Sequence, residues 1–113
     1  MSGLTTHVLD TMHGRPAAGV ALRLLKAGVV LVETRTNADG RSDGPLLDGG
    51  WMEKGRYRLE FEIGAYYRGQ SVTLPAIPFL ETVVVEFGVD DPAAHYHVPL
   101  LVSPYGYSTY RGS

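Results

Sequence analysis

Apolar and charged side chains alternate most regularly between Arg56 and Ile63. Every second residue is apolar and the residues between are charged: Tyr57, Leu59, Phe61 and Ile63 against Arg56, Arg58, Glu60 and Glu62. A period of two places successive side chains on opposite faces of a strand. The pattern predicts a strand of an antiparallel sheet, with one face on a core and the other in water.

Other short segments carry strand signals, and turn residues such as 37–40 and 48–50 separate them. The predicted strands are Leu4–Leu9, Ala21–Lys26, Val29–Thr36, Arg56–Ile63, Thr82–Val89, His95–Val102 and Tyr105–Tyr110, with a short one near Arg41–Ser42. Residues 65–68 could form one or two turns of helix before the prolines at 75 and 78. Seven or eight short strands with one short helix predict an all-β sandwich.

Length and composition narrow the class of protein further. A chain of 113 residues with no linker-like segment predicts one domain, 1–113. The net charge of −2, without a run of like charge, argues against nucleic-acid or membrane-surface partners. The chain has no cysteine, which excludes disulfides and thiolate chemistry. No signal-peptide pattern and no long apolar segment is present, so we expect a cytoplasmic protein.

The last residues are unusually aromatic for a chain end. Tyr105, Tyr107 and Tyr110 precede Arg111 and Ser113, and such rings predict a buried end. Burial would carry a guanidinium, a hydroxyl and the α-carboxylate into one sheltered place, which is costly unless they pair or bind a ligand. This favours a functional terminus, and the alternative is an edge strand whose last polar residues reach water.

The four histidines fall into two pairs. His13 lies in a turn and His95 begins a strand, so both are expected to be solvated. His7 and His97 lie within apolar strands and need partners, which would make them either core histidines or functional ones. Spacing of two residues between His95 and His97 could chelate zinc with His7 as a third ligand, but nothing completes a recognised ligand set. Arg41, taken alone, is typical of an exposed charge after a turn.

Several of these segments together resemble a known family. They are Leu4–Thr11, Asp39–Arg41, His97–Leu101 and the terminal Tyr110–Ser113, and they are similar to the 5-hydroxyisourate hydrolases, the transthyretin-related proteins of urate breakdown. The resemblance covers the whole chain. It implies a transthyretin-like (prealbumin-like) sandwich of two four-stranded sheets with one short helix. It also implies a homotetramer with two active sites in a channel where dimers meet.

The resemblance also implies the site and the reaction. His7, His97, Arg41 and Ser113 would be catalytic, while His7, Arg41, Tyr110, Arg111 and Gly112 would bind the substrate. The reaction implied is hydrolysis of 5-hydroxyisourate to 2-oxo-4-hydroxy-4-carboxy-5-ureidoimidazoline, with no metal or cofactor. A neutral imidazole is suited to proton transfer, and a guanidinium is suited to stabilising an oxyanion. The sequence does not indicate whether His7 or His97 is the primary base.

Two alternatives from other classes stay open on the sequence alone. The same fold could carry a small aromatic ligand in the channel without turnover, or it could be a purely structural module with a blocked channel. A carrier favours an apolar channel, whereas two histidines and two arginines are expected here.

Overall fold

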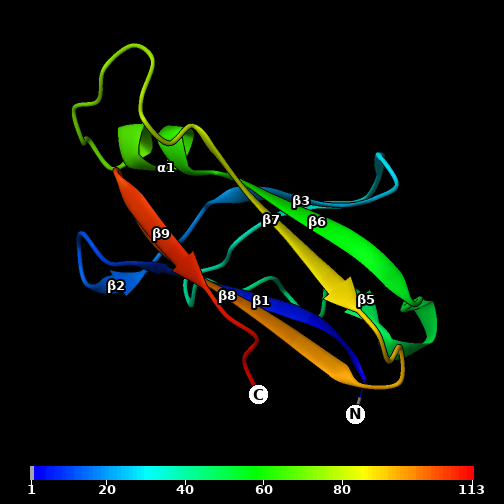
Figure 1. Cartoon of the computed structure of the whole chain (residues 1–113). Helices are drawn as coiled ribbons and strands as arrows, with labels where there is room; N and C mark the ends of the chain where they lie inside the picture. The colour runs from blue at the N-terminus through cyan, green and yellow to red at the C-terminus, as the bar shows by residue number, and fades with distance from the viewer. Residues whose placement is uncertain (1) are drawn as a thin grey trace.

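The computed structural model describes residues 2–113, which form two sheets packed face to face with one short helix at one end (Figure 1). The elements in chain order are β1 (Gly3–Asp10), β2 (Arg15–Pro16), β3 (Ala21–Lys26), β4 (Val29–Arg35), β5 (Leu47–Asp48), the 3-10 turn η1 (Gly49–Trp51), β6 (Gly55–Glu62), α1 (Ile63–Gly69), β7 (Thr82–Val89), β8 (His95–Ser103) and β9 (Gly106–Thr109).

The two sheets have different topologies. The β1–β8 sheet has the strand order β2-β1-β8-β9, and the short β5 also pairs with β1. The β3–β6 sheet has the order β4-β3-β6-β7 with antiparallel neighbours throughout. β1 and β8 run parallel over eight residue pairs, from Gly3 with His95 to Asp10 with Val102. The predicted sandwich of two four-stranded sheets is therefore confirmed, with β5 as an addition.

The core lies between the sheets and follows the predicted alternation. Tyr57, Leu59 and Phe61 of β6 are buried, whereas the charged residues between them face outward. Leu4 and Val8 of β1 are fully buried on the opposing sheet. Burying such side chains contributes roughly 1.5–3 kcal/mol each, so the regular alternation of β6 and β1 holds the two layers together.

Some strand predictions needed correction. Arg41–Ser42 is not a strand, because Arg41 makes only an isolated bridge with His7. β2 and β5 were not predicted, since two residues are too few to show a period. The helix was expected at 65–68 and begins at Ile63 instead, where the chain turns out of β6.

The prediction of a buried aromatic end is wrong for the single chain. Tyr105, Tyr107 and Tyr110 are 64%, 46% and 60% exposed. Alternation places Tyr105 and Tyr107 on one face, but β9 is an edge strand and none of its four residues is covered. Beyond β9 the tail continues beside β8, where the Gly112 amide donates to the His97 carbonyl at 2.8 Å (Figure 1).

A polar cluster fixes the helix to the end of β1, and we call Asp10, His13, Tyr66 and Tyr67 the Asp10 cluster. The carboxylate of Asp10 is fully buried and accepts hydrogen bonds from the His13 ring at 2.6 Å and from the two tyrosine hydroxyls at 2.7 and 2.9 Å. His13 is exposed in its turn, as expected, although its ring also donates to this carboxylate.

Candidate active site

Four polar side chains share the outer face of the β1–β8 sheet, and we call Thr5, His7, His95 and His97 the histidine face. Outward residues alternate with core residues along both strands. The parallel register sets Thr5 opposite His97 and His7 opposite Pro99. Side chains separated by some ninety residues in sequence are therefore neighbours because β1 and β8 are adjacent.

A tight turn positions Arg41 beside this face. The Asn37 side-chain oxygen accepts from the Asp39 and Arg41 amides, and the Gly40 carbonyl accepts from the Val8 amide at 2.8 Å. Gly40 has φ +75°, and a Cβ there would collide with the Val8 carbonyl oxygen, so only glycine fits this approach. The turn thereby fixes Arg41 against His7, with which it forms its bridge.

The surroundings favour the neutral form of both expected histidines. Burial lowers the pKa of His7, the positive charge of Arg41 lowers it further, and Asp39 opposes them. Burial also lowers the pKa of His97, with Arg41 and the neighbouring histidines acting in the same direction. An imidazole with a pKa below its ordinary value is uncharged at neutral pH, and in that state it can accept or donate a hydrogen bond.

The C-terminal tail approaches the histidine face through its backbone. A Cβ on Gly112 would lie 2.5 Å from Cδ2 of His97, so glycine lets the tail lie against this ring. Ser113 follows and is exposed. The structure therefore brings His7, His97, Arg41 and Gly112 together.

Tyr110 and Arg111 lie elsewhere in the single chain. Both line a groove of about 630 Å³ between the tail and β7, and His7, His97 and Arg41 do not line it. The Arg111 guanidinium stacks on the Tyr96 ring at 4.1 Å and donates to the His95 carbonyl at 3.1 Å. The family resemblance implied that Arg111 and Arg41 both bind the substrate, and the single chain does not bring these two side chains together.

Two members of the histidine face were not among the predicted site residues. His95 was expected to be solvated, yet its Nδ1 is buried and has no hydrogen-bond partner within residues 2–113. Thr5 lies between His95 and His97, with its hydroxyl within hydrogen-bond distance of both rings. In the sequence, alternation already places Thr5 on the same strand face as His7, and His95 on the same strand face as His97. The contact between Thr5 and the two rings, however, depends on the register of β1 and β8.

Within residues 2–113, no three His, Cys, Asp or Glu side chains lie close enough together to hold a metal ion. The zinc alternative for His7, His95 and His97 therefore has no ligand set in this geometry. In the same part of the chain, no helix is long and apolar enough to cross a membrane.

A family model for the HIUase/transthyretin family matches residues 4–112. The chain belongs to this family. One relative, 5-hydroxyisourate hydrolase 2 of Rhizobium meliloti, is 53% identical over 114 residues, which cover 97% of this chain and 95% of the relative. The resemblance found in the sequence is thereby confirmed.

Solved structures agree with the family assignment. A crystal structure of (S)-allantoin synthase matches with a TM-score of 0.92 and 43% identity, over 99% of this chain but only 44% of that longer chain. Sea bream transthyretin in complex with thyroxine matches with a TM-score of 0.82 and 32% identity, over 96% of this chain and 93% of that chain. This chain is therefore similar in fold both to a protein named as an enzyme and to a protein solved in complex with thyroxine.

Proposed function

We infer that this chain hydrolyses 5-hydroxyisourate in urate catabolism. The observation that carries this inference is the placement of His7 and His97 beside Arg41 on one face of the β1–β8 sheet, where burial and Arg41 lower the pKa of both rings. Identity of 53% to a 5-hydroxyisourate hydrolase over nearly the full length of both chains agrees with it. The product is 2-oxo-4-hydroxy-4-carboxy-5-ureidoimidazoline.

The chemistry follows from what these side chains can do. A water molecule attacks the C6 carbonyl of the substrate, and an imidazole of His7 or His97 takes its proton. Negative charge then develops on the former carbonyl oxygen, and the guanidinium of Arg41 stabilises it. When the tetrahedral intermediate collapses, the N1–C6 bond breaks and the proton passes to N1. These steps need no metal, and the reaction is expected to survive saturating chelator.

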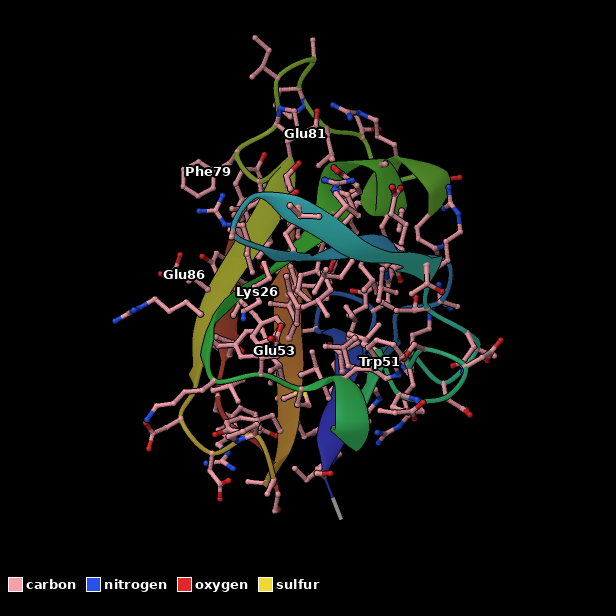
Figure 2. All side chains as sticks on the ribbon, turned by 90° about the vertical axis from the view of Figure 1, so that its right-hand side faces the viewer. Lys26, Trp51, Glu53, Phe79, Glu81 and Glu86 are labelled. Atoms are coloured by element: carbon pink, nitrogen blue, oxygen red, sulfur yellow. The ribbon has the colours of Figure 1, made fainter. Side chains whose placement is uncertain are left out.

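A homotetramer remains part of the proposal. Exposed aromatic side chains gather near the edge strand β9, where the Phe79 and Tyr105 rings lie 6.2 Å apart. Figure 2 shows Phe79 projecting outward from the loop before β7, and it is 72% exposed. Exposed apolar rings of this kind favour burial between subunits. Association over the β1–β8 sheet would turn its outer face into a channel, in which Tyr110, Arg111 and Ser113 are proposed to meet the substrate.

Two further expectations belong with this proposal. We propose that residues 1–113 act as one domain and that the protein works in the cytoplasm.

Sedimentation of the purified protein measures the proposed homotetramer directly, and a monomer that hydrolyses the substrate at full rate would remove the channel from the mechanism.

The second candidate is a carrier that binds an aromatic ligand without turnover. The likeness to a transthyretin in complex with thyroxine favours it. The histidine face and Arg41 argue against it, because charged and polar walls are costly to desolvate against an apolar ligand.

One assay separates the two candidates. Freshly prepared 5-hydroxyisourate is followed by ultraviolet absorbance with and without the protein, and with added EDTA. Decay faster than the spontaneous reaction, unchanged by EDTA, is expected. No acceleration, together with saturable binding of thyroxine, would support the carrier instead.

A further inference from the structure

The hydroxyl of Thr5 connects two imidazole rings. Its Oγ1 lies 2.7 Å from Nδ1 of His97 and 3.2 Å from Nε2 of His95. A threonine hydroxyl has one proton to donate and lone pairs to accept with, and a neutral imidazole donates from one nitrogen and accepts at the other. When both bonds form between neutral rings, Thr5 donates to one ring and accepts from the other.

The two distances favour one direction for this chain of hydrogen bonds. Hydrogen bonds from a hydroxyl to an oxygen usually have a heavy-atom separation of about 2.7–2.8 Å, whereas bonds from N–H to an oxygen are longer, at about 2.9–3.0 Å. The shorter contact therefore matches Thr5 donating to Nδ1 of His97. The longer contact matches Nε2–H of His95 donating to Thr5.

The buried nitrogen of His95 independently favours the same direction. Nδ1 of His95 has no partner within residues 2–113. If Thr5 donated to Nε2 of His95, this Nδ1 would carry a proton and be a buried N–H without an acceptor, which native structures rarely contain. If His95 donates from Nε2, its Nδ1 is a bare acceptor, which is left unsatisfied more often.

We propose that Thr5 and His95 hold His97 as the tautomer protonated at Nε2, so that His97 donates a hydrogen bond to the substrate and His7 alone carries the proton. This deepens the proposed function and rests on it. The substrate-facing nitrogen of His97 then has no lone pair for a water proton. Its N–H instead stabilises the oxygen that becomes negative as water adds to C6, alongside Arg41.

His7 both takes up and returns the proton that moves in the reaction. Its ring takes the proton from the attacking water while the oxygen of that water bonds to C6. It returns the same proton to N1 as the N1–C6 bond breaks, and ends neutral as it began. Neutral His97 donates throughout without losing its proton, and Thr5 and His95 act only as positioning residues.

Tautomers can be measured without any turnover. Nitrogen-15 spectra of histidine-labelled protein distinguish protonated from bare ring nitrogens, and His97 and His95 can be assigned with single-site variants. Above the pKa of both rings, Nε2 is expected to carry the proton in each. Protonated Nδ1 on His97 would overturn the proposal, and this result would stand whether or not the protein hydrolyses 5-hydroxyisourate.

Kinetics test the assigned roles. A glutamine amide can place an N–H near the position of an imidazole Nε2, and an asparagine amide is too short. His97→Gln should therefore keep at least about tenfold more kcat than His97→Asn, while His7→Gln should lose the 10²–10⁴-fold that proton transfer contributes. Equal loss in His97→Gln and His97→Asn would contradict a donor role for His97.

Thr5 is tested with a matched pair and a control. Thr5→Val keeps the shape and removes the hydroxyl, so kcat should fall about tenfold or more with little change in KM, as when an orienting partner is lost. Thr5→Ser should return kcat to within about threefold, and Thr82→Val on β7 of the other sheet should leave it unchanged. Wild-type rates in Thr5→Val would refute the positioning role, whereas an inactive wild type would refute the proposed function.

Discussion

The Asp10 cluster and the histidine face both belong to strand β1, and they differ in how fully their polar groups are satisfied. The Asp10 carboxylate accepts from two tyrosine hydroxyls and from the ring and backbone N–H of His13. On the histidine face, one buried nitrogen of His95 has no partner within residues 2–113. A cluster whose hydrogen bonds are all made stabilises the fold. The histidine face instead keeps half-buried polar side chains at the surface of the sheet, where a ligand can contact them.

The charge states of the two clusters differ as well. Burial alone would raise the pKa of Asp10, but the hydrogen bonds from His13 and the tyrosines hold it below its ordinary value. Burial and the bond to Asp10 raise the pKa of Tyr66 to about 12. The Asp10 cluster thus keeps one fixed negative charge, whereas the histidine face keeps neutral rings next to a cation.

The largest expected effect is a loss of activity caused by substitutions at His97 or Arg41. His97→Asn or Arg41→Lys should lower kcat by about two orders of magnitude or more, the usual scale for proton transfer or oxyanion stabilisation. The thermal midpoint should change little. His13→Asn is the matched control, because it should lower stability and leave kcat unchanged. Activity within threefold of wild type in Arg41→Lys would mean that the guanidinium fork is not needed.

Breaking the Asp10 cluster should give the opposite result. Asp10→Asn replaces one carboxylate oxygen, which accepts hydrogen bonds, with an NH2 group, which donates them. The neighbouring donors then face another donor, so the free energy of unfolding should fall by about 2–4 kcal/mol. The kcat of the folded protein should not change. Urea unfolding with parallel kinetics measures both, and a loss of kcat without a loss of stability would place Asp10 in the site.

A methyl group on the tail should have a smaller effect. Gly112→Ala forces the new Cβ against the His97 ring, so the ring or the tail must shift. We expect kcat to fall about tenfold, since misplacement by about an ångström is costly in catalysis, with unfolding almost unchanged. Wild-type kcat in this variant would show that the tail does not set the position of His97.

The smallest effects should appear in pH titrations. Because the pKa values of His7 and His97 in the free protein lie below 6.5, kcat/KM should be level above 6.5 and fall only at lower pH, when the acting base is protonated. Below 6.5 the unfolded chain also binds these protons more readily than the folded one, so stability declines with acid.

Asp10 adds a second step to the stability curve at lower pH. Its folded pKa lies below 3.8, so its contribution is present above 3.8 and is lost as pH falls through the folded value. Thermal midpoints measured from pH 8 to pH 3 test the predicted loss of stability with acid for the two histidines and for Asp10. A midpoint that rises on acidification would contradict this prediction.

The sequence predicted what depends on local pattern. Alternation located β6 and the inward face of β1, and the Asn-Ala-Asp-Gly turn at residues 37–40 placed Arg41 at its end. His95 was misjudged because its surroundings come from Thr5, ninety residues away, through the register of β1 and β8. Likewise, the rings of Tyr105 and Tyr107 reveal an apolar face, but period-two patterning cannot tell whether another chain covers it.

Parallel pairing of β1 with β8 also has a consequence for synthesis on the ribosome. The β3–β6 sheet needs only residues 21–89, so it can pair while translation continues. β1 emerges first and must wait for β8, because residues 3–10 pair with residues 95–102. Through most of its elongation the nascent chain therefore carries β1 with only the short pairings to β2 and β5 available. The histidine face is assembled only after residues 95–102 have been synthesised.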